Sequence, residues 1–208
     1  MNSPRHTVHF GHVLRSRKRC CAATVIRAAC LTVVLTVMVA ALTSLSAVAH
    51  GGDNAMSLTI SSPAFPNGED IPRKFTCEGP DTSPQLTWSE PPGGTKYFAL
   101  LVDDPDAPVG NWNHWAIWNI PAGARGLAEG VKKLAQLPDG SAQGTNDFHK
   151  VGYNGPCPPA GKPHRYFFKL FALDAKIDLP ATAGKKELEA AMKGHVLAQA
   201  EWMGRFHR

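Results

Sequence analysis

The sequence predicts a mainly β domain, an all-β sandwich that carries one helix near its C-terminus. The 208 residues include 17 prolines and 19 glycines, and both residue types favour turns over long helices. The apolar runs are short and bounded by turn residues, as strands are. Helical spacing of apolar residues occurs in one place, close to the C-terminus. A domain of about 150 residues is large enough to bury a substantial core.

The first 49 residues form a separate extension. They hold six basic residues and no acidic one, with an apolar run at residues 28–48. The run ends in Ala47-Val48-Ala49, small residues that suit signal peptidase, so residues 1–49 are predicted to be a secretory signal cleaved before His50. The alternative is an uncleaved membrane anchor at residues 28–48, because about 20 apolar residues span a bilayer. Five threonines and serines interrupt the run, which favours cleavage and export to the periplasm or the medium.

The positive charge of the chain belongs to this extension. The whole chain has a formal net charge of +5, from 22 basic and 17 acidic residues. Without the six basic residues of the extension, 16 basic residues face 17 acidic ones. Nucleic-acid binding needs a basic face that neutralises phosphates, so we expect no nucleic-acid partner. The mature form is expected to be soluble.

The predicted strands follow a flexible N-terminus at residues 50–56. A first short strand lies at residues 58–61, and residues 85–88 alternate polar and apolar side chains before a turn rich in Pro and Gly. Residues 96–102 and 115–120 are almost entirely apolar, as strands covered on both faces are. These two strands therefore form the centre of the predicted core.

The second half of the domain begins with loops and ends with a helical pattern. Residues 121–150 are Gly-rich and weakly periodic, which predicts loops with short strands, and residues 167–173 predict another apolar strand. A break at residues 178–184 separates that strand from the helical pattern. Apolar and neighbouring residues then recur at steps of three and four, which predicts a helix through Leu188, Ala191, Met192, His195, Val196 and Gln199.

Two polar clusters stand beside apolar strands. The first is the turn Asp103-Asp104-Pro105-Asp106-Ala107-Pro108, followed by Trp112-Asn113-His114-Trp115 at the start of the next strand. The second runs from Gly155-Pro156-Cys157-Pro158-Pro159 to His164-Arg165-Tyr166, directly before the strand at residues 167–173. Aspartate and proline also form turns that have no function. Because two such clusters flank buried strands of one small domain, we expect them to converge on a site.

Together these motifs resemble the phosphatidylethanolamine-binding proteins, in their bacterial Raf-kinase-inhibitor-like branch. The resemblance includes Phe75-Thr76-Cys77-Glu78-Gly79 and the segment from Asp81 to Trp88, and it extends from about Ser57 to the C-terminus. It implies a domain at residues 57–208 with two antiparallel sheets in Greek-key order and a C-terminal helix. It also implies a small anion-binding pocket.

The resemblance assigns ten residues to that pocket. His114, His164 and Tyr166 supply imidazole and phenol donors, and the small Gly155 lets backbone amides approach an anion. A carboxylate repels phosphate, but it fixes a histidine tautomer and accepts a proton from the ligand, so the pocket should prefer protonated or monoanionic ligands. Asp106 matches the motif and has the alternative role of forming the turn. The ten are Asp104, Asp106, Pro108, Trp112, His114, Gly155, Pro158, Pro159, His164 and Tyr166.

Two cysteines, Cys77 and Cys157, remain after signal cleavage. An even pair in an oxidising compartment predicts one disulfide, and the alternative is two separate buried thiols. The two cysteines lie far apart in the sequence and form no Cys-x-x-Cys motif, so a metal site is not expected. No cofactor is expected either.

The function favoured by these observations is the binding of a small anion, phosphate or a phosphorylated head group, without turnover. One alternative is an interaction protein that inhibits a partner enzyme, a protease or a kinase. Another is a hydrolase that uses an Asp–His pair as general base. The sequence has no Gly-x-Ser-x-Gly motif, and Ser141 is the only serine after position 90, which disfavours a serine hydrolase. The natural ligand, the partner protein and a homodimer are left open.

Overall fold

The computed structural model describes residues 57–208. The predicted signal at residues 1–49, the alternative anchor at residues 28–48 and the N-terminus at residues 50–56 lie outside the described residues. Within residues 57–208, no helix is long and apolar enough to cross a membrane.

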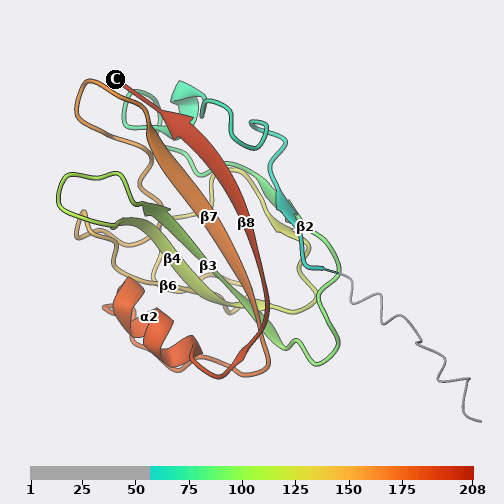
Figure 1. Cartoon of the computed structure of the whole chain (residues 1–208). Coiled ribbons are helices and arrows are strands. Elements are labelled where there is room, and N and C mark those ends of the chain that lie inside the picture. Colours follow the sequence, from blue (N-terminus) through green and yellow to red (C-terminus); the bar gives the residue numbers. More distant parts are fainter. Residues whose placement is uncertain (1–56) are drawn as a thin grey trace, which may run out of the picture. The chain divides into compact units, whose positions relative to one another are not determined.

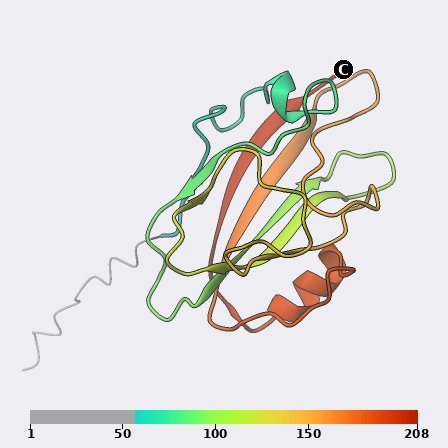
Figure 2. The same cartoon turned by 180° about the vertical axis from the view of Figure 1, so that it is seen from behind.

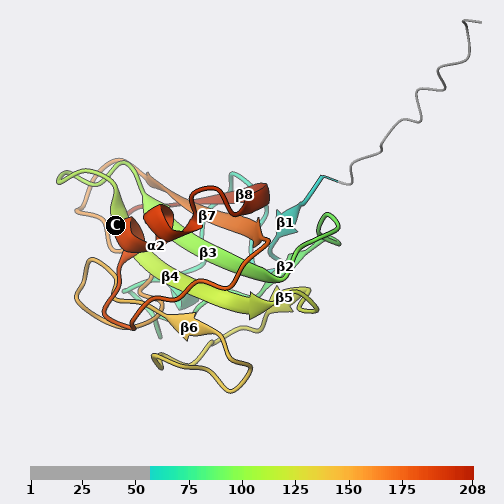
Figure 3. The ribbon, with the colours of Figure 1, turned by 90° about the horizontal axis from the view of Figure 1, so that it is seen from below.

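The larger of two antiparallel sheets has five strands in the order β6-β4-β3-β7-β8 (Figures 1 and 3). A hairpin joins β3 to β4, whereas the connection from β7 to β8 contains the helix α2 (Lys185–Met192), and β3 pairs with β7 across a long stretch of sequence. Antiparallel pairing therefore places the C-terminal end of β3 beside the N-terminal ends of β4 and β7. The strands are β3 (Tyr97–Asp104), β4 (Trp112–Pro121), β6 (Ala142–Gln143), β7 (His164–Leu173) and β8 (Val196–Phe206).

The smaller sheet has three short strands in the order β1-β2-β5. They are β1 (Ile60–Ser61), β2 (Leu86–Trp88) and β5 (Gly126–Leu127). A 3-10 helix, η1 (Arg73–Phe75), lies between β1 and β2 in the chain. The view from behind in Figure 2 shows the long connections between β4 and β7, drawn in yellow and orange. The two sheets confirm the predicted mainly β fold.

Side chains of β3 alternate between two cores, which explains its continuous apolar sequence. Phe98 and Leu100 face the core shared with the smaller sheet, together with Leu86 and Phe168. Leu101 faces the other way, into a second core that contains residues of the helix.

The helix α2 (Lys185–Met192) covers that second face of the large sheet (Figure 1). It buries Leu188 and Met192, which are four residues apart and so lie on one side of the helix. At its N-terminus the backbone N–H of Gly184 donates to the Glu187 carboxylate at 3.0 Å. This bond satisfies a backbone group that the helix itself leaves unpaired.

The prediction that the helical pattern continues through Val196 and Gln199 was wrong. The helix ends at Met192, Gly194 adopts φ = +85°, and the chain returns along β7 as β8. Eleven residues of β8 alternate in exposure, and pairing with β7 satisfies their backbone groups. Leu197, Ala198 and Gln199 have high helix propensity, so sheet pairing here outweighs both the local spacing and the propensity.

The predicted disulfide between Cys77 and Cys157 is present, with 5.4 Å between the Cα atoms. It joins the segment after η1 to the segment before β7. The backbone N–H of Cys77 also donates to the carbonyl of Pro156 at 3.1 Å. The bridge thus fixes one wall of the region where the two polar clusters meet.

Candidate functional site

A cavity of about 200 Å³ opens where the β3–β4 turn meets the segment that leads into β7. Seven of the ten predicted site residues line it, so the two polar clusters converge as predicted. Tryptophan, phenylalanine and proline supply five of the eleven lining residues, and two more are histidines. The lining residues are Asp104, Ala107, Pro108, Val109, Trp112, His114, Phe148, Cys157, Pro158, Pro159 and His164.

Asp104 joins the two clusters. It ends β3 beside the first residue of β7, and its side chain is almost fully buried. Its Oδ2 atom accepts a hydrogen bond from Nδ1–H of His164 at 2.8 Å. Its Oδ1 atom accepts the backbone N–H of Asp106 at 2.9 Å, which stabilises the turn. The carboxylate therefore orients the imidazole and leaves Nε2 of His164 for a ligand.

Asp106 lies outside the lining of the cavity and stabilises its rim. Its carboxylate forms two hydrogen bonds with the Arg165 guanidinium, at 2.8 and 2.9 Å, and accepts the backbone N–H of Arg165 at 3.0 Å. These contacts lower the pKa of Asp106 to about 2. The geometry matches the alternative reading, in which this residue serves the turn.

His114 is buried at the base of the cavity, with 2% of its surface exposed. Its Nδ1 atom lies 2.7 Å from the backbone carbonyl oxygen of Asn154. Because a carbonyl only accepts, Nδ1 carries the proton, and Nε2 is the ring nitrogen left for a ligand. Burial lowers the pKa of His114 below its ordinary value of 6.5. The neutral ring therefore presents an acceptor, whereas the sequence suggested a donor.

Tyr166 packs beneath the cavity and is not part of its lining. Its ring meets the His114 ring edge-on, with 5.2 Å between the centroids. The hydroxyl is buried, and among residues 57–208 no hydrogen-bond partner lies within ideal geometry. Burial and the nearby Asp104 carboxylate raise the pKa of Tyr166 well above its usual range, so the hydroxyl keeps its proton. The Tyr166 hydroxyl is therefore a buried donor close to Asp104, and its ring packs against His114.

Gly155 also lies outside the lining, and its amide is already engaged. The backbone N–H donates to Oδ1 of Asp81 at 2.6 Å. A Cβ atom at this position would lie 2.0 Å from the carbonyl oxygen of Phe75. Glycine is therefore required here for the close approach of two backbone segments. An anion would have to displace Asp81 to reach this amide.

The aromatic wall includes one residue that sequence reasoning missed. Trp112 and Phe148 meet edge-on at 5.5 Å, and Phe148 also contacts the edge of His114 at 5.1 Å. Phe148 belongs to a loop without a motif, so no local pattern identified it. Val109, at the tip of the β3–β4 turn, is 78% exposed and forms the outer rim.

A family model for the phosphatidylethanolamine-binding proteins matches residues 61–207. A UPF0098 protein of Methanothermobacter thermautotrophicus is 48% identical over 151 residues, which cover 73% of this chain and 99% of the relative. A UPF0098 protein of Aquifex aeolicus is 47% identical, with 73% and 89% covered. The crystal structure of YbcL from Escherichia coli, a member of the mammalian PEBP family, matches with a TM-score of 0.69 and 37% identity, covering 73% and 99%.

The chain belongs to the phosphatidylethanolamine-binding protein family. The match contains α2, every strand except Ile60 at the start of β1, and all of the residues that line the cavity. Among residues 57–208, no lysine or arginine lines the cavity. Among residues 57–208, no three His, Cys, Asp or Glu side chains are grouped so as to hold a metal ion. The chemistry of the site therefore rests on one carboxylate, two imidazoles and an aromatic wall.

Proposed function

We propose that this protein binds one small acid group, phosphate or a phosphorylated head group, in its monoanionic form and without turnover. Membership of the phosphatidylethanolamine-binding protein family supports a binding role. The observation that carries the proposal is the pair of imidazoles in one cavity, each with Nδ1 occupied by an acceptor of the protein. Both Nε2 atoms are thereby left for a ligand.

The charges around the cavity favour a monoanion over a dianion. Asp104 contributes a buried negative charge, and no cationic side chain of lysine or arginine lies in the lining. His164 donates Nδ1–H to Asp104, and Nε2 of the same ring offers a second donor to a ligand when the ring is protonated. The neutral His114 ring accepts a hydrogen bond at Nε2, and the P–O–H group of a phosphate monoanion donates it. A dianion lacks that proton and meets more repulsion.

The cavity offers no group suited to nucleophilic attack. Of the lining residues that the structure describes, only Cys157 has a nucleophilic atom besides the carboxylate and imidazoles, and its sulfur is in the disulfide. Ser141 is fully buried and lies outside the lining. A carboxylate-oriented imidazole alone can serve as general base for water, so the hydrolase alternative is tested directly below.

Calorimetry with methyl phosphate and dimethyl phosphate tests the proposal. At about pH 5 both ligands are monoanions, because the second pKa of a phosphate monoester lies near 6, and they differ in one P–O–H group. We expect methyl phosphate to bind more tightly. His164→Ala should weaken its binding about ten- to a hundredfold, the loss of a charge-assisted hydrogen bond of roughly 1.5–3 kcal/mol.

His195→Ala is the matched control for this experiment. His195 forms the same kind of pair, with Nδ1 2.9 Å from Asp174, on the exposed surface. Its loss should leave affinity unchanged. Unaltered binding in both His114→Ala and His164→Ala would place the site elsewhere. If the wild type releases phosphate from methyl phosphate and the same variants do not, the protein is a hydrolase and the binding proposal is wrong.

We further propose that the domain acts after export, with cleavage before His50. The sequence of residues 1–49 and a disulfide between Cys77 and Cys157 support this. N-terminal sequencing of the protein from culture medium or periplasm should give a start at or near His50. A mature chain that retains residues 28–48 would contradict cleavage and favour the anchor.

A further inference from the structure

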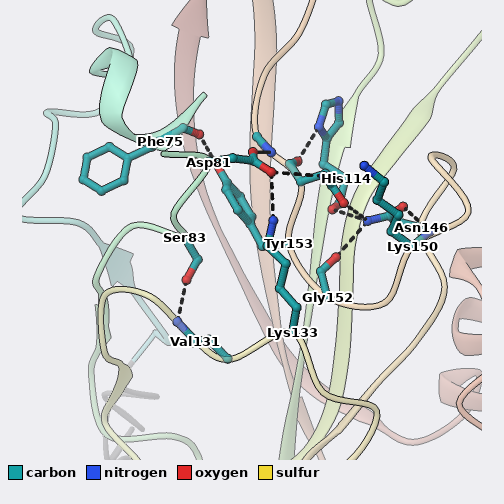
Figure 4. Close-up of polar contacts among 12 residues, drawn as sticks. Phe75, Asp81, Ser83, His114, Val131, Lys133, Asn146, Lys150, Gly152 and Tyr153 are labelled. Atoms are coloured by element: carbon teal, nitrogen blue, oxygen red, sulfur yellow. Dashed lines mark hydrogen bonds and ion pairs between the residues drawn. The ribbon is translucent and has the colours of Figure 1, made fainter. Parts of the chain in front are cut away.

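Asp81 lies behind the cavity wall, in the segment that follows η1. Its backbone has φ = +57°, a left-handed conformation that few side chains adopt. Its carboxylate accepts the N–H of Gly155 at 2.6 Å, the side-chain amide of Asn154 at 3.1 Å and the Lys133 ammonium at 2.8 Å. Figure 4 shows this network between Asp81 and His114.

Asn154 connects Asp81 to His114. Its carbonyl oxygen accepts Nδ1–H of His114 at 2.7 Å, and its backbone N–H donates to the His114 carbonyl at 3.0 Å. Its side chain is held at both ends, because the amide nitrogen donates to Asp81 and the amide oxygen accepts Nδ2–H of Asn146 at 2.9 Å. Three hydrogen bonds, two of the Asn154 side chain and one of its backbone N–H, therefore fix the position of the carbonyl that sets the His114 tautomer.

A second branch of the network reaches the aromatic wall. The side-chain oxygen of Asn146 accepts the backbone N–H of Phe148 at 3.0 Å. It also accepts the backbone N–H of Lys150 at 3.1 Å (Figure 4). Its Nδ2 atom donates to the carbonyl of Gly152 at 2.8 Å. Phe148 contacts the His114 ring, so one network fixes both the hydrogen bond and the packing of this imidazole.

We propose that Asp81 is a positioning residue that fixes the tautomer and orientation of His114 in the cavity. Without its carboxylate, Gly155 and the Asn154 side chain each lose an acceptor, and the Asn154 carbonyl can move away from Nδ1. His114 then also populates the tautomer with the proton on Nε2, which donates to a ligand instead of accepting. The effect on ligand choice rests on the proposed function, whereas the tautomer does not.

Nitrogen NMR of the histidine rings in the ligand-free protein is the direct test. In the wild type, Nδ1 of His114 should give a protonated signal and Nε2 an unprotonated one. Asp81→Asn should give intermediate values for both nitrogens, because the new amide places a donor against the Asn154 amide. Asn154→Ala, which removes both side-chain tethers and keeps the carbonyl, provides a second variant if Asp81→Asn does not fold.

Lys133→Met is the matched control, because it removes one partner of Asp81 and leaves the bonds to Asn154 and Gly155. Its His114 signals should match those of the wild type. A folded Asp81→Asn protein with wild-type nitrogen signals would overturn the proposal. If Lys133→Met changes the His114 nitrogen signals as much as Asp81→Asn does, the effect belongs to the Asp81–Lys133 ion pair, and the proposal is also overturned.

Ligand binding provides an independent readout. The preference of the wild type for methyl phosphate over dimethyl phosphate should shrink at least threefold in Asp81→Asn, because an Nε2–H donor no longer needs the proton of the ligand. An unchanged preference beside altered nitrogen signals would overturn the link to ligand choice. If neither ligand binds the wild type, the proposed function fails, and the nitrogen signals still decide the role of Asp81.

Discussion

Removal of the Cys77–Cys157 disulfide should lower the stability of the domain by several kcal/mol. The bridge joins residues 80 apart in sequence. Closing a loop of that length lowers the conformational entropy of the unfolded chain by about 15 cal/mol/K. At 25 °C this entropy loss destabilises the unfolded state by about 4.5 kcal/mol relative to a chain without the bridge. Measured bridges typically contribute about 2–4 kcal/mol, so the entropic value is an upper figure.

The native cavity wall should survive this loss. The N–H of Cys77 still donates to Pro156, Gly155 still donates to Asp81, and the Tyr153 hydroxyl still donates to the Phe75 carbonyl at 2.7 Å. The bridge therefore acts mainly on the unfolded state. With an unfolding entropy of about 2.1 cal/mol/K per residue, 2–4.5 kcal/mol corresponds to a Tm lower by roughly 6–14 °C for a domain of about 150 residues.

Thermal and urea unfolding of the Cys77→Ala/Cys157→Ala double variant measures the effect. Reductant should lower the Tm of the wild type to a similar value and leave the double variant unaffected. Affinity for methyl phosphate at 25 °C should change less than twofold, since the remaining contacts hold the wall. A variant with a Tm within about 2 °C of the wild type would refute the reasoning, as would two alkylatable thiols in the unreduced native protein.

Two further predictions follow from single positions. Gly155→Ala should cost about 1–3 kcal/mol, because its Cβ would lie 2.0 Å from the carbonyl oxygen of Phe75, whereas Gly123→Ala, with no atom within 4 Å, should unfold like the wild type in urea. The lowered pKa of His114 means that the unfolded state binds its proton first, so stability should fall as pH drops below 6.5 and level off below the folded pKa. His114→Gln should flatten the pH dependence of unfolding in this window, and an identical slope would contradict the shift.

The main strands could be predicted because their sequences match their environments. β3 and β4 are covered on both faces, so their central residues are apolar, and the apolar runs at residues 96–102 and 115–120 correctly predict both strands. The predicted helix includes Leu188 and Met192 correctly but extends too far. Residues of β8 alternate only weakly in polarity, and a local sequence pattern contains no information about pairing with β7. Strand pairing with β7 therefore determines the conformation of residues 196–206.

The sequence predicts those site residues that lie in a motif at the end or the beginning of a strand. Asp104 and His164 stand at adjacent strand ends, so antiparallel pairing alone brings them together. The proton on Nδ1 of His114 depends on a carbonyl 40 residues away, and the engagement of the Gly155 amide depends on Asp81, 74 residues away. These partners lie in loops whose sequences carry no period, so only the folded chain reveals them.

The neighbouring residues Asp103 and Asp104 show how the fold supports the cavity. Strand alternation sends their side chains to opposite faces of the sheet. Asp103 is fully buried and pairs with Lys185 of α2 at 2.8 Å and with Lys169 of β7 at 3.2 Å, while Asp104 holds His164. The end of β3 is thus fixed from the helix side by ion pairs to the fully buried Asp103 carboxylate. A carboxylate on so constrained a strand keeps its geometry better than one on a loop, and this favours a cavity that is already formed before any ligand binds.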